Sequence, residues 1–563
     1  MGIRALCILG AAVSLGLALP GPAAAAPAPT ASSSVSLGAG GGAGGGAGDA
    51  EDETPLMRAA AVNPDPAVLR TLLAAGAGID DSDVYGMNAL LYASRSNARP
   101  AVLRTLLAAG AEVNRPDAAG VSALMMAARS CSDAEAVRVL LGAGARVGAR
   151  NLDGRTALMY GVENRDPEVA KLLLAAGARV NESDSTGMTA LMYAARNRNP
   201  AVAGELLSSG ATVNAANCAG VTPLMIAAGW NDNPDVLKAL LDAGADVNAR
   251  DADGMTALVC AADSGADPAI VRMLIARGAR IDERSNRGWT ALMTAVDENP
   301  DLRMIEALIR LGADIEARNS YGQTPLMWAA AEATNPAVLR LLLASGAKVE
   351  DRDDDGRTPL MWAILSNPDP EIARTLIAAG ADMEDKDKRG LTPLMLATSQ
   401  RGPICAPGFT ALDPSSPFNA AGAAAPAGRE VPKGAPDLKD PASLYVSLDN
   451  LRMLLKAGAK VDEVDEKGRT ALILAAEGNS IPSVVDALLA GGSGVDERDA
   501  EGMTALMAAC RWTENPDIVA ALLAAGSDVA MRDEAGKSAF DYAGENAVLK
   551  GSRIMEQLSC RDR

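Results

Sequence analysis

A seven-residue motif recurs along almost the whole chain, and its spacing constrains the fold more than any other feature of the sequence. The first copy reads TPLMRAA and begins at Thr54. Its first residue, taken here as position 0, recurs at Asn88, Ser122, Thr156, Thr189, Thr222, Thr256, Thr290, Thr324, Thr358, Thr392, Thr470, Thr504 and Ser538. Copies start 33 or 34 residues apart, except for a step of 78 after Thr392 that equals one 34-residue repeat plus 44 residues. Such a period is typical of stacked helical repeats.

Each repeat carries the start and stop signals of two helices. The Thr-Pro pair of the motif predicts a first helix, with threonine as N-cap and proline at the first helical position. About ten residues later an Asn-Pro or Asp-Pro pair predicts a second helix, as at Asp65-Pro66 and Asn299-Pro300. The second helix ends at a glycine suited to a left-handed backbone. These glycines are Gly76, Gly110, Gly144, Gly177, Gly210, Gly244, Gly278, Gly312, Gly346, Gly380, Gly458 and Gly526. A D-x-x-G tight turn then leads to the next motif.

This pattern resembles the ankyrin repeat from residue 53 to residue 560, because the period, the helix starts, the glycine stops and the turn recur together. The resemblance implies an all-α solenoid of about 14 helix-turn-helix repeats with short β-hairpin turns. It also implies a concave groove, lined by hairpin tips and first-helix ends, that grips a protein partner. The family usually has His at position +3, where this chain has methionine, as at Met57 and Met125. We therefore expect apolar contact to replace the polar tie between repeats.

The N-terminal residues, the insertion within the repeats and the C-terminal residues make up the remaining segments of the chain. Residues 1–25 are typical of a signal peptide, with Arg4, an apolar run over 5–19 and an Ala-Ala-Ala cleavage site at 23–25, although a buried helix is the alternative. Residues 26–52 form a Gly/Ala/Ser-rich linker, repeats occupy 53–398, and residues 399–446 form a Pro/Ala/Gly-rich insertion. Repeats and a C-terminal cap fill residues 447–563. We expect the protein to be exported, to the periplasm or the extracellular space, with no membrane insertion after cleavage. By analogy, this combination suggests a bacterial member of the family.

The composition removes most kinds of chemistry from consideration. The chain has no histidine, and therefore lacks the commonest general base and the commonest zinc ligand. A net charge of −19 disfavours nucleic acid. The acidic run at 351–356 resembles half a calcium loop, but Trp362 stands where a bidentate Glu is needed. We therefore predict no catalytic residue, no cofactor, no metal site and no small-molecule substrate. Six cysteines would remain after cleavage, and we expect most of them to be small buried residues.

Large side chains at the groove positions are the candidate contacts for a partner. They are Trp230, Trp289, Trp512, Tyr85, Tyr321, Met87, Met188, Met255 and Met503. Exposed aromatic and methionine side chains gathered on one surface are typical of protein interfaces. A column of rings at position +4 favours packing between first helices, with partner binding as the alternative; it comprises Tyr92, Tyr160, Tyr193, Trp328, Trp362 and Tyr542. The charges at the groove positions change sign along the chain, from Arg95, Arg129 and Arg196 early to Asp263, Asp297, Glu298 and Glu332 in the middle. Such a groove could orient an elongated partner, with solvated surface charge as the alternative.

These patterns favour a protein-interaction scaffold outside the cytoplasm. Three alternatives stay open: a secreted effector that binds host proteins, a passive envelope scaffold, and an unrecognised enzyme or metal-binding protein. The insertion adds a further question, because it holds two of the three phenylalanines, Phe409 and Phe418. A long loop of this kind could dock on a partner or fold back on the solenoid.

Overall fold

The computed structural model describes residues 53–96, 98–298, 302–398, 448–478 and 481–561. The predicted signal peptide, linker and insertion, together with the Asn299-Pro300 pair, lie outside these residues. The structure forms two compact units, one ending at Ala279 and one beginning at Arg280. Within the described residues each unit holds seven repeats of two helices, as the motif predicts.

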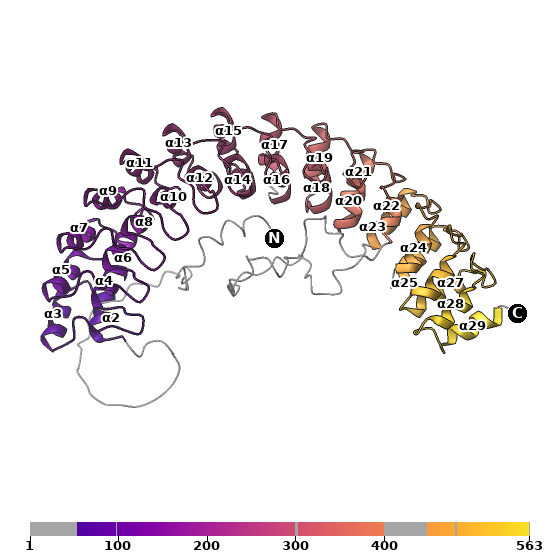
Figure 1. Ribbon diagram of the computed structural model, residues 1–563, viewed down its shortest axis with the longest axis horizontal. Coiled ribbons are helices and arrows are strands. Elements are labelled where there is room, and N and C mark those ends of the chain that lie inside the picture. Colours follow the sequence, from indigo (N-terminus) through magenta and orange to yellow (C-terminus); the bar gives the residue numbers. More distant parts are fainter. Residues whose placement is uncertain (1–52, 97, 299–301, 399–447, 479–480, 562–563) are drawn as a thin grey trace, which may run out of the picture. The chain divides into compact units, whose positions relative to one another are not determined.

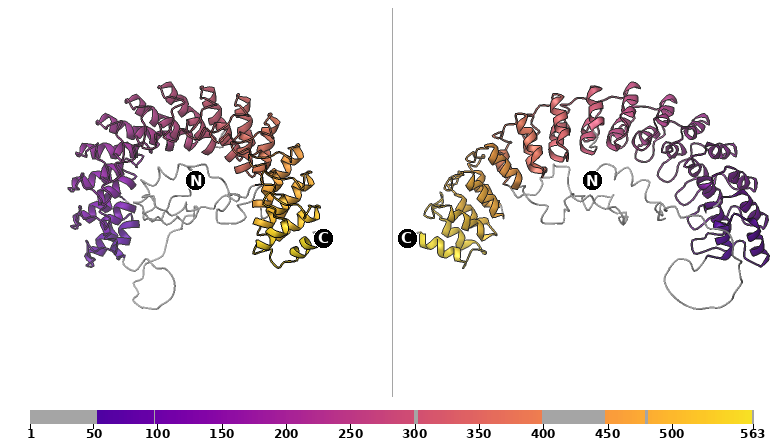
Figure 2. Two further views of the ribbon diagram at one scale, coloured as in Figure 1. Left: turned by 45° about the vertical axis from the view of Figure 1, so that its right-hand side comes forward. Right: turned by 180° about the vertical axis from the view of Figure 1, so that it is seen from behind.

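In the first unit the helices form two rows, which can be followed in Figure 1 and from two further directions in Figure 2. The first helices of the repeats are α2 (Pro55–Val62), α4 (Ala89–Ser96), α6 (Ala123–Ser130), α8 (Ala157–Gly161), α10 (Ala190–Ala194), α12 (Pro223–Trp230) and α14 (Ala257–Ser264). The second helices are α3 (Pro66–Ala74), α5 (Pro100–Ala108), α7 (Glu135–Gly142), α9 (Pro167–Ala175), α11 (Pro200–Ser208), α13 (Pro234–Asp242) and α15 (Pro268–Ala276). Each helix packs on its partner and on the same helix of the neighbouring repeats.

The second unit repeats this arrangement. Its first helices are α16 (Ala291–Glu298), α18 (Pro325–Glu332), α20 (Pro359–Ser366), α22 (Pro393–Leu396), α24 (Ala471–Gly478), α26 (Ala505–Trp512) and α28 (Ala539–Glu545). Its second helices are α17 (Leu302–Arg310), α19 (Pro336–Ala344), α21 (Pro370–Ala378), α23 (Leu448–Ala457), α25 (Pro482–Ala490), α27 (Pro516–Ala524) and α29 (Arg553–Arg561). Although 51 residues separate Leu396 from Leu448, α22 and α23 still pack together as the two helices of one repeat.

Local chemistry explains why the helices begin and end where they do. Thr358 caps α20, because its side chain accepts a hydrogen bond from the Met361 backbone N–H, and Pro359 follows at the first position. Asp369 caps α21 in the same way, accepting from Glu371 N–H at 2.9 Å. Gly380, just after α21, has φ +100°, a conformation that favours glycine. All twelve predicted stop glycines have positive φ, so this part of the sequence prediction is confirmed.

The core is a continuous apolar layer between the two rows. Position +2 is buried in successive repeats of the first unit, as at Leu90, Leu124, Leu158 and Leu191, each about 1% exposed. Because each repeat contributes one such layer, neither unit has a single centre of packing, and stability is distributed along the stack.

Candidate functional site

The candidate site in each unit is the inner face, which we define as the hairpin tips together with the first-helix side chains at positions +4, +7 and +8. Each tip is built on a polar residue at position −5. Asp353 is typical: its Oδ1 accepts from the backbone N–H groups of Asp355 and Arg357, at 2.9 and 2.8 Å. Burial raises the pKa of this carboxyl above its ordinary value, although these backbone bonds and Trp362 oppose the shift.

Successive tips are joined by backbone hydrogen bonds. Asp354 N–H donates to Tyr321 O at 3.1 Å, and the equivalent bond joins Ala118 N–H to Tyr85 O at 2.8 Å. The tip glycines permit this approach. A Cβ placed on Gly187, whose φ is +82°, would come within 2.8 Å of the Cys218 nitrogen. The tips of each unit are therefore held side by side in a fixed order.

The ring column at position +4 is mostly part of the core. Tyr92, Tyr160, Trp328, Trp362 and Tyr542 are at most 9% exposed, which favours the packing interpretation, whereas Tyr193 is half-buried.

The polar atoms of most of these rings bond to the −5 residue of the same repeat. Tyr193 Oη donates to Asp184 Oδ2 at 2.6 Å, and Trp362 Nε1 donates to Asp353 Oδ2 at 2.9 Å. Trp328 is the exception, since its buried Nε1 has no hydrogen-bond acceptor among the described residues.

The tip methionines do not form an exposed surface, and this part of the prediction is wrong. Met87, Met188, Met255 and Met503 are 4%, 7%, 4% and 2% exposed. Their place at position −1 puts them beneath the neighbouring hairpin. The Met188 sulfur, for example, lies 3.6 Å from the side-chain nitrogen of Asn217, which belongs to the next repeat.

The predicted aromatic contacts divide into exposed and half-buried side chains. Trp230 and Trp512, at position +8, are 36% and 41% exposed, and Tyr85 at the first tip is 68% exposed. Tyr321 is half-buried. Trp289 was expected at the rim, clear of the packing, but it is half-buried against Trp328, with ring centroids 4.7 Å apart. Trp289 is therefore partly a packing residue.

Arginines stack on the inner-face rings. The buried Arg155 lies between Tyr160 and Tyr193, 4.1 and 4.3 Å from the ring centroids, and pairs with Glu163. In the second unit, Arg511 lies 4.5 Å from the exposed Trp512 ring. A guanidinium against an aromatic face is a favourable contact that also restrains both side chains. The inner face therefore presents ordered rings and charges.

Polar ties between repeats are present, contrary to the expectation drawn from the missing histidines. Buried asparagines between the two helices supply them: Asn197 donates to Val162 O and Asn164 O at 2.8 and 2.7 Å, and Asn231 donates to Ala195 O at 2.8 Å. The methionine at position +3 bonds only locally, as at Met192, whose sulfur accepts from Thr189 N–H at 3.4 Å.

A second series of ties lies at position −8 and differs between the two units. In the first unit Asn214 donates to Gly244 O and accepts from Asp246 N–H. In the second unit a carboxyl group replaces the amide; Glu350, for example, accepts from Asp382 N–H at 2.8 Å. Sequence reasoning missed both series, although asparagine recurring at one register was a signal that could have identified them.

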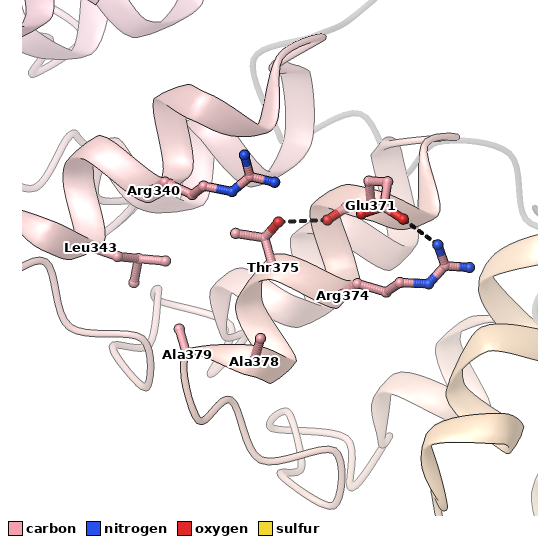
Figure 3. A pocket seen from close by; sticks show the side chains of 7 residues that line it. All are labelled: Arg340, Leu343, Glu371, Arg374, Thr375, Ala378 and Ala379. Atoms are coloured by element: carbon pink, nitrogen blue, oxygen red, sulfur yellow. Dashed lines mark hydrogen bonds and ion pairs between the residues drawn. The ribbon is translucent and has the colours of Figure 1, made fainter.

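Outside the inner face, one open depression lies between α19 and α21 on the second helices. It is lined by Arg340, Leu343, Glu371, Arg374, Thr375, Ala378 and Ala379 (Figure 3). Glu371 turns back to its own helix, where it pairs with Arg374 and accepts through its backbone carbonyl from Thr375 Oγ1. Across the described ranges, no group of three or more Cys, Asp or Glu side chains is arranged to hold a metal ion. No described helix is long and apolar enough to cross a membrane.

Two rows of short antiparallel helices, joined by stacked hairpins, define a helical-repeat solenoid. The family model for ankyrin repeats, written for three copies, matches residues 36–117, 124–217, 205–285, 224–319, 266–353, 292–387, 326–406 and 442–533. The chain therefore belongs to the ankyrin repeat family. The crystal structure of the human ASB11 ankyrin repeat domain is similar, with 28% identity over 40% of this chain and 99% of that one and a TM-score of 0.36. No curated protein sequence matches the chain.

Proposed function

We propose that this protein is a protein-interaction scaffold that binds its partner through the inner face and works outside the cytoplasm, in the periplasm or the extracellular space. Ankyrin repeats are protein-interaction scaffolds, and the family match covers most of the chain. The export part of the proposal rests on the signal-like residues 1–25. A secreted effector that binds host proteins is the alternative.

One observation carries the binding proposal. The two tryptophans at position +8, Trp230 and Trp512, are the exposed tryptophans of the described inner face. Every other tryptophan of the chain is buried or half-buried, so the fold covers indole rings wherever it uses them for packing. An exposed indole restrained by Arg511 is typical of the anchors that carry most of the binding energy at interfaces.

The test begins with capture of the natural partner. Crosslinking the full-length protein in its own compartment, followed by mass spectrometry, should identify a protein that co-purifies with it. Binding of that partner is then compared between the parent and the variants Trp230→Ala and Trp512→Ala. We expect at least one variant to weaken binding by about 2 kcal/mol or more.

A matched control and a stability measurement make this test decisive. Val68→Ala shortens an exposed side chain (36% exposed) on the second helix α3, outside the inner face, and reports the general effect of surface truncation. Both tryptophan variants should keep the thermal midpoint of the parent, since surface substitutions change stability by about 0.5 kcal/mol or less. If both are stable and bind as tightly as the parent, the two tryptophans are not the anchors of the binding surface. Recovery of the protein only in the cytoplasm, with Met1 retained, would refute export.

A further inference from the structure

The inner face of the first unit combines unpaired positive charge with an apolar rim. We propose that its first five repeats dock a protein segment rich in acidic and apolar side chains. This inference rests on the proposed scaffold function and names the chemistry of the partner.

The positive charge comes from position +7. Arg95 lies in α4, Arg129 in α6 and Arg196 in the turn two residues after α10. They share one register of the repeat, and all three are exposed. Within the described residues no carboxylate lies within ion-pair distance of Arg95 or Arg196. Arg129 pairs with Glu163 at 3.0 Å, but that same carboxylate also pairs with the buried Arg155. The net charge of this strip is therefore positive in a chain whose total charge is −19.

The carboxylates nearest this strip accept hydrogen bonds within the hairpins and form no ion pair with Arg95 or Arg196, although Asp117 still interacts electrostatically with Arg95. Asp83 accepts from the backbone N–H groups of Tyr85 and Met87 and from Tyr92 Oη. Asp117 accepts from two backbone N–H groups of its own turn. Each therefore has its lone pairs directed into its own hairpin, while the guanidinium groups remain exposed to solvent.

The apolar rim consists of the first three tips. Val84 and Tyr85 at the first tip are 72% and 68% exposed, and Leu152 at the third is 80% exposed. The second tip carries Ala118 and Ala119. Backbone bonds of 2.8 and 3.0 Å join these tips in order, so the exposed side chains form a neighbouring row. The tips of the second unit differ, since most of them carry charged residues such as Asp354 and Lys388.

Charge complementarity indicates which kind of protein segment this surface binds. A segment with carboxylates meets Arg95, Arg129 and Arg196, and apolar side chains on the same segment cover Tyr85 and Leu152. Helices of this kind pack about 8–10 Å apart, and an extended chain advances about 3.3 Å per residue. One acidic residue in every three would therefore place one carboxylate on each repeat. Nucleic acid fits less well, because it offers no apolar side chain for the rim and needs a longer basic track.

The test uses the full-length protein and three labelled peptides in fluorescence anisotropy. The first peptide is four repeats of Glu-Val-Ser, the second replaces Glu by Lys, and the third replaces Val by Ser. We expect the first to bind, the second not to bind and the third to bind at least fivefold more weakly. Affinity for the first should fall with added salt, as expected for exposed charge pairs.

Matched variants assign the binding to the proposed surface. The double reversal Arg95→Glu with Arg196→Glu should weaken the first peptide at least tenfold, and Leu152→Ser at least threefold. Arg340→Glu, on the outer helix α19, and Val464→Ser, in the second unit, should leave its affinity unchanged. Equal affinity for the Glu and Lys peptides, or no effect of the double reversal, would overturn the proposal. Tighter binding of a DNA duplex than of the first peptide would overturn it as well, in favour of a polyanion site.

Binding of the captured natural partner to these variants distinguishes failure of this inference from failure of the proposed function. If the captured partner loses affinity for the Trp230 or Trp512 variant but binds the double reversal as tightly as the parent, the scaffold function stands and this inference fails. If none of these variants affects the partner, the inner face itself is excluded.

Discussion

The unpaired indole of Trp328 gives the sharpest test of how the hairpins and first helices are tied together. In the repeat that follows, Trp362 Nε1 donates to Asp353 at position −5. In the repeat of Trp328 that position is Asn319, whose Oδ1 accepts from the Tyr321 and Gln323 N–H groups. Its Nδ2 donates to Gln323 Oε1, so no acceptor is left for the buried indole. Replacing Asn319 with Asp should provide one.

The expected change in stability is the gain from the new hydrogen bond minus the cost of burying the new carboxylate. A buried donor without a partner costs about 1–3 kcal/mol, and a hydrogen bond to a charged acceptor contributes about 1.5–3 kcal/mol. Burial of the new carboxylate works against this gain, as the raised pKa of Asp353 indicates for the equivalent site. Because the two terms partly cancel, we expect Asn319→Asp to stabilise the second unit by about 1 kcal/mol. The reverse change, Asp353→Asn, should destabilise it by about 1–3 kcal/mol because Trp362 then loses its charged acceptor.

The assay has to report on one repeat, because each repeat contacts only its neighbours and can open locally. Hydrogen exchange of the segment 324–334, measured by mass spectrometry at pH 7, reports opening of α18. Trp328→Phe supplies the control, since phenylalanine has no N–H. In a double-mutant cycle, the gain from Asn319→Asp should disappear when Trp328→Phe is also present. Equal protection in Asn319→Asp and the parent, or a gain that survives in the double variant, would refute the account of the indole.

Three further measurements test other features. Asn231→Ala should destabilise the first unit by about 2 kcal/mol or more in urea unfolding, because two carbonyls of the preceding repeat lose their donor; an unchanged midpoint would show that this tie is unimportant. Partial desolvation and Asp385 raise the pKa of Glu350 to about 7, so its favourable contribution is present at low pH and is lost as the pH rises through 7. Glu350→Gln should therefore flatten the pH dependence of the urea midpoint between about pH 4.5 and 7, and an unaltered slope would contradict this. Iodoacetamide should alkylate the exposed Cys218 in the native protein and spare Cys510, whose burial raises its thiol pKa to about 12; equal labelling would disprove that difference.

The sequence predicted the fold closely because its signals are local. A cap such as Thr358 and a stop such as Gly380 depend on a few neighbouring backbone groups, and the structure places both as the motif indicated. The site was predicted only in part, because exposure depends on the next repeat. Met188 stands in a turn, where a side chain is usually exposed, yet the following hairpin covers it. Trp289 is a residue type typical of interface anchors, but its burial depends on Trp328, 39 residues further along the chain.

The hydrogen bonds between tips also determine how each unit responds to load. They join equivalent residues of successive repeats, as from Ala118 to Tyr85 and from Asp354 to Tyr321, so they run along the direction in which the repeats are stacked. A force that stretches a unit is therefore transmitted through these bonds in series, and the weakest junction opens first while the others hold. Because each repeat contacts only its neighbours, we expect such a unit to yield one repeat at a time. We therefore expect tension along a unit to disturb its inner face one repeat at a time.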